Sequence, residues 1–206
     1  MKKQVFFEKL QKEAKNSGID IAETFAHSLF SYYKEMFMWN KRVNLIAKKE
    51  KDRFIKRHII DSLSILSKLS IKENGRFLDI GSGNGLPGIP IAIMLPNASV
   101  ALIESNRKKC IFLQHIKSRL GLNNISIFCE RFEKIYASLE KFHYVLVRGK
   151  KVSNKEKEMV ISILRNEGSL IIYAGEETYI PTLSIGEKKE CFGTTEHRKI
   201  IKISRL

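Results

Sequence analysis

Apolar side chains follow two different periodicities along this chain, and the change from one to the other falls near Gly75. Over residues 1–74 they recur every three to four positions, which predicts helices throughout. Asp20 followed by Glu23 has the form of a capping box and predicts the start of one helix, and a second helix is expected over about 50–69. The side chains expected to face inward are Phe25, Leu29, Tyr32, Met36 and Phe37 in the first helix, and Phe54, Ile55, Ile59, Leu63, Leu66 and Leu69 in the second.

From Arg76 onward, short apolar runs alternate with helical patterns. Alternation of this kind predicts a parallel sheet that is covered by helices on both faces. The last two runs follow each other without a helix between them, so we expect them to form an antiparallel hairpin. The expected strands are 76–80, 99–104, 125–129, 144–148, 168–174, 188–193 and 198–204, and the expected helices are about 87–95, 106–120, 131–139 and 153–165.

These patterns predict an α/β protein with a Rossmann-like, mostly parallel sheet and an N-terminal helical extension. Residues 1–74 are expected to pack as a helical region on the sheet domain of residues 75–206, so that both parts form one compact domain. Gly121 stands where the glycine after a helix belongs, and Ser153 with Glu156 repeats the capping-box signature.

A glycine-rich turn ends the first expected strand. Residues 76–88 read R-F-L-D-I-G-S-G-N-G-L-P-G, so the strand runs into Gly81, Gly83 and Gly85 before a helix begins near Pro87. Glycines permit positive φ angles and let a ligand approach the backbone closely. The turn fails the G-x-G-x-x-G spacing of dinucleotide sites and lacks the Gly-Lys-Ser/Thr of a phosphate-binding loop. Its D-x-G-x-G-x-G form, which includes Asp79, is that of S-adenosylmethionine enzymes and predicts a site for this cofactor at the carboxyl edge of the sheet.

Acidic side chains follow the next two expected strands. Glu104 ends the second strand, where a carboxylate accepts hydrogen bonds from ribose hydroxyls in nucleoside-binding folds of this kind. An exposed carboxylate at a strand end, without a ligand, is the alternative. Residues 130–133, Glu-Arg-Phe-Glu, end the third strand and are placed to hold an adenine ring. A simple loop that binds no ligand is the alternative.

The charge balance favours a polyanionic partner. The chain carries 37 Lys and Arg against 22 Asp and Glu, a formal net charge of +15. Each basic side chain near a phosphate releases condensed counterions, which favours nucleic acid, whereas a solvated lysine-rich surface is the alternative. Residues 41–57 alone hold eight basic and two acidic side chains. The expected RNA-binding residues are Lys41, Arg42, Lys48, Lys49, Arg53, Arg57, Lys150, Lys151 and Arg198.

The three cysteines, Cys110, Cys129 and Cys191, are widely spaced and show no C-x-x-C pair. This spacing predicts neither a disulfide framework nor a zinc site, which suits a reducing cytoplasm. No stretch approaches the ~20 apolar residues that cross a bilayer. We therefore expect a cytoplasmic monomer that holds no metal ion and does not enter a membrane.

Several segments outside the glycine turn are more specific than the turn itself. They identify the chain as similar to the bacterial small-subunit (16S) ribosomal RNA guanine-N7 methyltransferases of the RsmG (GidB) type, from about Met38 to the C-terminus. The segments are W-N-K-R-V-N-L at 39–45, R-H-I-I-D-S-L at 57–63, L-D-I-G-S-G-N-G-L-P-G-I-P at 78–90, K-K-C-I-F-L at 108–113, L-N-N-I at 122–125 and E-H-R-K at 196–199.

The resemblance implies a cofactor site that uses Gly81, Leu86, Phe132, Glu133 and Arg148, and a target guanine in a loop of small-subunit rRNA. Around the fourth strand the family usually reads F-D-x-V-x-S-R-A. This chain reads F-H-Y-V-L-V-R-G at 142–149, so it keeps the arginine but has His143, Val147 and Gly149 at the other three positions. These departures concern the positioning of the cofactor and the base more than the class of reaction.

Methylation of guanine N7 needs no general base, because N7 carries an exposed lone pair and no proton. Positioning of the reactants and tolerance of the charge that develops on the base are expected to supply the catalysis. No residue is therefore assigned as a catalytic acid or base, and Arg148 and His58 are the candidates for positioning the substrate. His58 and Asp61 are spaced to pair on one helix face, either structurally or in catalysis. Because N7 faces the deep, narrow groove of A-form RNA, the target base should be unpaired or flipped out.

Two other functions fit the same sequence. One is an S-adenosylmethionine-dependent methyltransferase that acts on a small molecule or a protein, which would turn over without RNA. The other is a non-catalytic RNA-binding or assembly factor, which would retain the fold without binding the cofactor.

Overall fold

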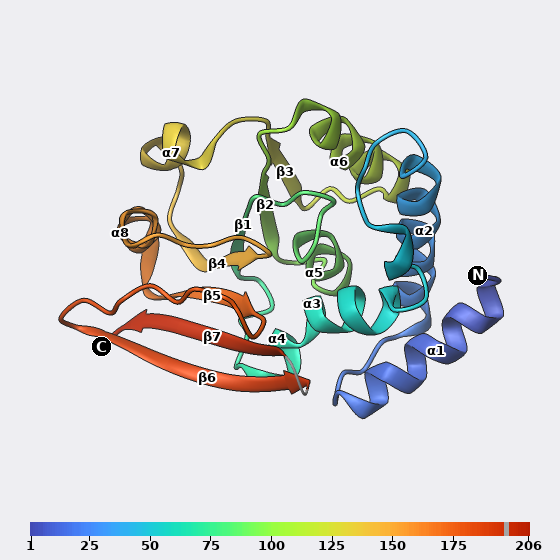
Figure 1. Cartoon of the computed structure of the whole chain (residues 1–206), viewed down its shortest axis with the longest axis horizontal. Helices are drawn as coiled ribbons and strands as arrows, with labels where there is room; N and C mark the ends of the chain where they lie inside the picture. Colours follow the sequence, from blue (N-terminus) through green and yellow to red (C-terminus); the bar gives the residue numbers. More distant parts are fainter. Residues whose placement is uncertain (196–197) are drawn as a thin grey trace.

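A computed structural model describes residues 1–195 and 198–206 of the chain, so Glu196 and His197 of the E-H-R-K segment lie outside the described residues. A seven-stranded sheet in the order β3-β2-β1-β4-β5-β7-β6 forms its centre (Figure 1). β1 to β5 run parallel, while β7 runs antiparallel to both of its neighbours. The Rossmann-like fold and its terminal hairpin are thereby confirmed. The strands are β1 (Arg76–Ile80), β2 (Ser99–Ile103), β3 (Ile125–Phe128), β4 (Phe142–Arg148), β5 (Leu164–Ala174), β6 (Glu187–Thr195) and β7 (Arg198–Arg205).

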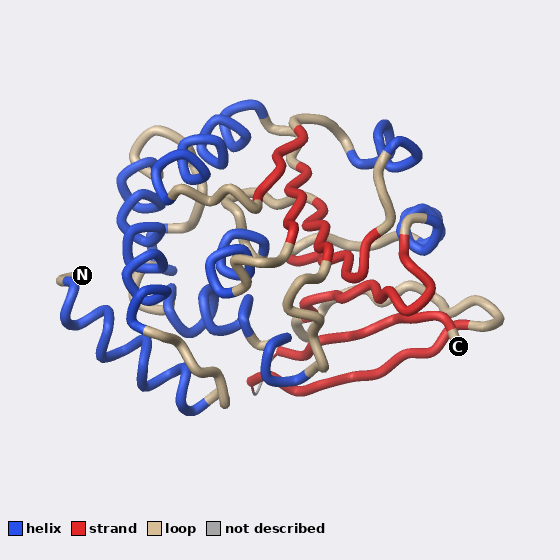
Figure 2. The backbone as a smooth tube through the Cα atoms, turned by 180° about the vertical axis from the view of Figure 1, so that it is seen from behind, coloured by secondary structure: helices blue, strands red, loops and turns tan. Residues whose placement is uncertain are grey.

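Helices cover both faces of the sheet, as the alternation of strands and helices predicts. Along β4, Leu146 belongs to the core cluster on one face, whereas Val145 and Val147 belong to the cluster on the other face. The first cluster also contains the helical region of residues 1–74, and the second contains residues of α7 and α8 (Figures 1 and 2). The helices after β1 are α5 (Gly88–Met94), α6 (Arg107–Leu120), α7 (Phe132–Ile135) and α8 (Asn154–Ser162).

Two of the expected helix ends are confirmed, and one is wrong. Gly121 follows α6 with a φ of 63°, and the Ser153 hydroxyl accepts a hydrogen bond from the backbone N–H of Glu156 at 3.1 Å. Asp20 does not cap the next helix. α2 (Glu23–Trp39) begins after Ala22, and no side chain caps it.

The long helix expected over 50–69 is broken into short pieces. Serine hydroxyls supply one physical reason. Ser62 donates to the carbonyl of His58 at 2.5 Å and Ser64 donates to that of Asp61 at 2.6 Å, in competition with backbone N–H groups. The apolar spacing still gave the buried face correctly, since Phe54, Ile59 and Leu63 are fully buried. The pieces are a 3₁₀ helix (Lys48–Glu50), a π-helix (Ile55–Ile60), α3 (Asp61–Leu63) and α4 (Ile65–Lys68), which follow α1 (Lys3–Asn16) and α2.

The sheet register brings the candidate site residues to one edge. Ile80 lies opposite both Ile103 and Val147 in the parallel ladders, and Arg148 lies opposite Tyr173. The residues that follow β1 and β2, and the last residues of β4 and β5, therefore share the carboxyl edge, which is where open α/β sheets bind ligands.

Candidate functional site

The glycine-rich turn bends sharply where β1 ends. The backbone N–H groups of Gly81 and Ser82 both donate to the carbonyl of Ile103, each at 2.9 Å, which fixes the turn to the end of β2. Gly81, Gly83 and Gly85 have φ angles of 72°, 57° and 90°. Only glycine adopts this left-handed region without strain, so the turn requires glycine at these positions.

The glycines of the turn serve two purposes, as the space around a Cβ atom built at each position shows. A Cβ atom at Gly85 would lie 2.4 Å from Cγ1 of Ile89, and one at Gly88 would lie 2.3 Å from Cδ2 of Leu102, so these two glycines serve close packing of α5. At Gly83 the nearest atom would be 3.7 Å away, and at Gly81 it would be the side chain of Lys150 at 3.4 Å. Gly81 and Gly83 therefore present open backbone, which fits a ligand that lies against the turn.

Two cavities meet at this open backbone. The main cavity, of about 710 Å³, is lined by residues that include Gly81, Gly83, Leu86 and Arg148. The side cavity, of about 190 Å³, includes Gly81 with Glu130, Arg131, Phe132 and Glu133. Gly81 and Lys150 line both cavities, so one ligand that crosses the turn would reach from one cavity into the other. The structure thus brings together most of the cofactor residues expected from the sequence.

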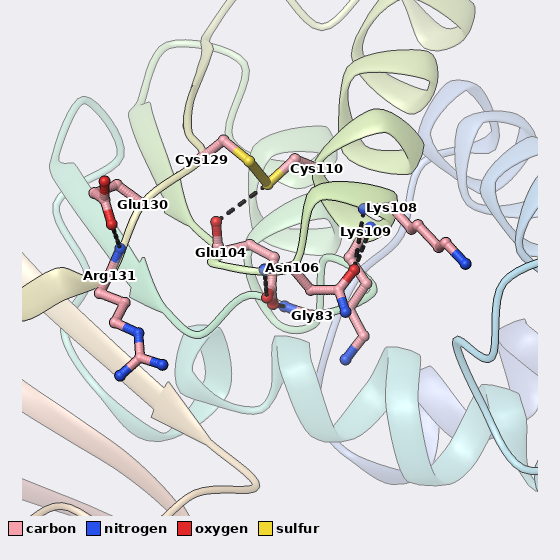
Figure 3. Close-up of a disulfide and its surroundings, with 9 residues drawn as sticks. All are labelled: Gly83, Glu104, Asn106, Lys108, Lys109, Cys110, Cys129, Glu130 and Arg131. Atoms are coloured by element: carbon pink, nitrogen blue, oxygen red, sulfur yellow. Dashed lines mark hydrogen bonds between the residues drawn. A yellow bond between two sulfur atoms is a disulfide. The ribbon is translucent and has the colours of Figure 1, made fainter.

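Glu104 lies behind the turn rather than on an exposed strand end. Its carboxylate accepts hydrogen bonds from the backbone N–H groups of Gly83 at 2.8 Å and Asn106 at 2.7 Å (Figure 3). The residue is 7% exposed. Glu104 lines neither cavity, and its observed contacts hold the turn in place. Each carboxylate oxygen has a second lone pair, which could accept a hydrogen bond from the hydroxyl of a ligand that lay against Gly83.

Asp79 lies beneath the turn and lines neither cavity. One carboxylate oxygen, Oδ2, accepts from the backbone N–H of Gly88 at 3.0 Å, while Oδ1 is buried without a partner. Burial raises the pKa of Asp79 to about 7, against the lowering effect of the Gly88 hydrogen bond. This residue therefore connects β1 to the start of α5.

A cluster of charged side chains lies beside the turn, at the carboxyl end of β4. Arg148, at the end of β4, donates from Nε to Oδ2 of Asp61 at 3.1 Å and from Nη2 to the carbonyl of Arg57 at 2.7 Å. Arg198 donates to the same oxygen of Asp61 at 2.8 Å. Arg148 Nη2 also lies 3.2 Å from Nδ1 of His58, so His58 and Asp61 meet through the arginine instead of directly.

The protonation state of His58 follows from this position. Burial and then the positive charge of Arg148 lower the pKa of His58 to about 4, although a hydrogen bond to Glu50 opposes the shift. Its Nε2 lies 3.1 Å from Glu50. His58 is therefore neutral at pH 7 and does not add positive charge beside Arg148.

Two residues that the sequence analysis missed complete the site. Tyr173 lies at the carboxyl end of β5, lines the main cavity and donates to the carbonyl of Ser62 at 2.7 Å. Asn84 lies inside the turn, and its side-chain amide donates to the backbone carbonyl of Leu45 at 3.1 Å. The backbone carbonyl of Asn84 accepts a hydrogen bond from the hydroxyl of the buried Tyr32 at 2.7 Å. The strand-end rule applied to Glu104 would have found Tyr173, but the contacts of Asn84 with the helical region leave no signal in the sequence.

The predicted RNA-binding residues divide between the cavity and the outer surface. Lys150, Lys151 and Arg198 line the main cavity. The side chain of Lys48 lies outside what the structure describes. The exposed members on the helical region are Lys41, Arg42, Lys49, Arg53 and Arg57.

A disulfide joins Cys110 to Cys129 beside the side cavity (Figure 3), although the spacing of the cysteines predicted no disulfide framework. The two residues are 19 positions apart, but α6 brings the chain back to β3, so their Cα atoms lie 5.9 Å from each other. Cys129 directly precedes Glu130, and Cys110 Sγ contacts the carbonyl of Glu104 at 3.1 Å. The disulfide therefore links the segment after β2 to the wall formed by residues 130–133.

We expect loss of this disulfide to lower the free energy of unfolding by about 3 kcal/mol, the loop entropy of a cross-link of this length. The Cys129→Ser variant and the reduced wild type should show the same loss in urea denaturation. Cys191→Ser is the control, because Cys191 is the exposed free cysteine. Equal stability of Cys129→Ser and Cys191→Ser under oxidising conditions would contradict the pairing.

Among the described residues, no group of three or more His, Cys, Asp or Glu side chains is placed to hold a metal ion. A search of the same residues also finds no helix with the length and apolar character needed to cross a membrane.

Comparisons with known proteins agree on one family. The family model described as rRNA small subunit methyltransferase G matches residues 25–201. A protein of Pseudomonas fluorescens, named ribosomal RNA small subunit methyltransferase G, is 40% identical over 126 residues, which are 61% of this chain and 58% of the relative. A protein of the same name from Cellvibrio japonicus is 36% identical over 146 residues, 70% of this chain and 66% of that relative. The chain therefore spans less than two thirds of the length of these relatives.

Solved structures of methyltransferases share the fold. A precorrin-6y C5,15-methyltransferase from Geobacter metallireducens has a TM-score of 0.55 at 18% identity, over 79% of this chain and 91% of that chain. An S-adenosylmethionine-dependent methyltransferase from Aquifex aeolicus has a TM-score of 0.54 at 14% identity, over 71% and 90%. These structural likenesses bear on the fold alone, whereas the family match covers most of the sequence. The resemblance drawn from the sequence segments is thus confirmed, and the chain belongs to the rRNA small subunit methyltransferase G family.

Proposed function

We propose that this protein transfers the methyl group of S-adenosyl-L-methionine to N7 of a guanine in small-subunit (16S) rRNA. The observation that carries the proposal is the open backbone of Gly81 and Gly83 at the junction of two cavities, with the fixed guanidinium of Arg148 at the end of the neighbouring strand. Membership of the family supports the same conclusion from the sequence.

The residues around the turn suit this cofactor. Glu104 retains lone pairs for the hydroxyls of a ribose beside Gly83, and Phe132 and Glu133 border the side cavity where an adenine ring would lie. Leu86 gives the main cavity an apolar wall. S-adenosylmethionine, when bound, supplies an electrophilic methyl group on a sulfonium centre. The chain's own task is to hold that group and the base in line.

The chemistry needs no proton transfer in the site. Guanine N7 carries a lone pair and no proton, so methyl transfer to it would require no side chain of the protein to accept a proton. Asp61 and the carbonyl of Arg57 hold the guanidinium of Arg148 from two sides, which keeps it in a fixed position at the cavity wall. His58 is uncharged at neutral pH, and both of its ring nitrogens already face partners, Nδ1 the guanidinium of Arg148 and Nε2 the carboxylate of Glu50. Arg148 is therefore suited to positioning the guanine, and His58 to orienting Arg148.

The target guanine has to be unpaired or flipped out to reach this site. The main cavity, at about 710 Å³, accommodates a flipped-out base beside the turn. The formal charge of +15 favours RNA as the substrate. Because rRNA is the proposed substrate, we expect the protein to act in the cytoplasm as a monomer.

Methyl transfer to small ribosomal subunits and to their naked rRNA tests the proposal. We expect labelled methyl from S-adenosylmethionine to enter the rRNA at a guanine and to make that position sensitive to borohydride and aniline cleavage, which detects N7-methylguanine. Label on protein or on another base, or turnover without RNA, would contradict it and favour a methyltransferase with a different substrate. Calorimetry without any binding of S-adenosylmethionine would favour a non-catalytic RNA-binding factor.

A further inference from the structure

The helical region contains a second large cavity, which we call the α1 groove. It measures about 680 Å³, close to the size of the main cavity, and lies between α1, residues 52–57, and Thr194 and Arg198 of the last two strands. Figures 1 and 2 both show the C-terminal end of α1 near the end of β6. The basic residues that line the α1 groove are Lys9, Lys12, Arg53, Lys56, Arg57 and Arg198.

Positive charge dominates the lining of the α1 groove. The acidic residues there are Glu13, Asp52 and Asp61, and Asp61 is already engaged by Arg148 and Arg198. Lys9, Lys12, Arg53 and Lys56 are exposed and form no ion pair with any residue that the structure describes. Several unpaired cations gathered in a hollow repel one another, so the free energy of binding a polyanion there is favourable.

The α1 groove adjoins the main cavity at Arg198. Arg198 lines both cavities, and its guanidinium shares Oδ2 of Asp61 with that of Arg148. Arg57 lines the α1 groove with its side chain, and its carbonyl accepts the hydrogen bond from Arg148. A strand whose base entered the main cavity would therefore continue past Arg198 into the α1 groove.

The composition of the α1 groove identifies which part of an RNA strand it suits. Among the described residues that line it, no side chain is aromatic, so it offers no surface on which bases stack. Cationic side chains, with Asn16 and Ser17, match phosphate and ribose oxygens instead. We infer that the α1 groove binds the sugar-phosphate backbone beside the target guanine, independently of base sequence. This inference rests on the proposed function. α1 precedes the residues that the family model matches, so the inference draws on the structure of this chain.

Neutralising α1 tests this inference. In the Lys9→Gln, Lys12→Gln variant we expect the affinity for a small-subunit rRNA transcript to fall roughly tenfold, and the slope of log affinity against log salt to decrease by about two, one for each phosphate contact. Affinity for S-adenosylmethionine, measured by calorimetry, and the methylated position should stay unchanged, because α1 lies outside the main cavity. Glutamine is a good helix former, so α1 should remain folded in circular dichroism.

The Lys188→Gln, Lys189→Gln variant is the matched control, since both lysines are exposed on β6 and line neither large cavity. Equal RNA affinity and salt slope in the two variants, with a wild type that methylates the RNA, would overturn the inference and leave the proposed function standing. A wild type that neither binds nor methylates the RNA would overturn the proposed function. A drop confined to the α1 variant supports both.

Discussion

The Gly83→Val variant should bind S-adenosylmethionine at least a hundredfold more weakly than the wild type, a loss of about 2.7 kcal/mol, while remaining folded. Gly83 has a φ of 57°, and a Cβ atom there would meet no protein atom closer than 3.7 Å. The added side chain would therefore occupy the space in front of the turn rather than displace the core. A branched side chain at this position also favours a negative φ, which would pull the backbone N–H of Gly83 away from Glu104.

The Gly121→Val variant separates these effects from backbone strain. Gly121 has a φ of 63°, and a Cβ atom there would meet nothing within 4 Å, so valine carries a comparable strain of about 1–2 kcal/mol far from the turn. Both variants should lose similar stability in urea denaturation. In calorimetry with S-adenosylmethionine, however, only Gly83→Val should lose affinity. Wild-type affinity in a folded Gly83→Val variant would mean that the cofactor lies elsewhere.

The sheet and the glycine turn could be predicted because their signals are local. Each strand is a short apolar run, and glycines at a fixed spacing after β1 indicate the turn. The parallel strands and the final hairpin follow from fold-level rules, whereas the order of the strands in the sheet comes from the structure. Residues at the carboxyl ends of adjacent strands, such as Glu104 and Arg148, could be assigned to one edge before the structure was known.

Contacts between distant segments could not be predicted in the same way. Asp61 and Arg148 are 87 positions apart, and Asp61 and Arg198 are 137 apart, so their meeting depends on how the helical region docks onto the sheet. The Cys110–Cys129 disulfide likewise depends on the return of the chain through α6. The apolar spacing also fails to predict a break where a side chain competes with the backbone for hydrogen bonds. In the helix expected over 50–69, the hydroxyl of Ser62 donates to the carbonyl of His58, which a backbone N–H would otherwise use.

Asp61 pairs with both Arg148 and Arg198, and its substitution should lower stability more than that of any other member of this charged cluster. We expect Asp61→Ala to lower the free energy of unfolding by about 3 kcal/mol, because it leaves the guanidinium of Arg148 buried beside that of Arg198 without a carboxylate between them. The side chain of Arg148 is 10% exposed, so water replaces little of the lost interaction. Urea denaturation at pH 7 measures the effect, and a loss below about 1 kcal/mol would mean that the pair behaves like an exposed ion pair.

Removing the charges of both Asp61 and Arg148 should separate the stability that this ion pair contributes from the role of Arg148 in catalysis. In the Asp61→Leu, Arg148→Met variant neither charge of the buried pair is left alone, and Arg198, which also loses Asp61, has a side chain that is 32% exposed and can be solvated by water. Stability should therefore return most of the way to that of the wild type. Methyl transfer to rRNA should nevertheless remain low, because the side chain proposed to position the guanine is gone. Recovery of activity together with stability would show that Arg148 supports the fold alone. A stable double variant that binds S-adenosylmethionine but does not methylate RNA would instead place Arg148 on the substrate side of the cavity, where the ladder between β4 and β5 sets it opposite Tyr173.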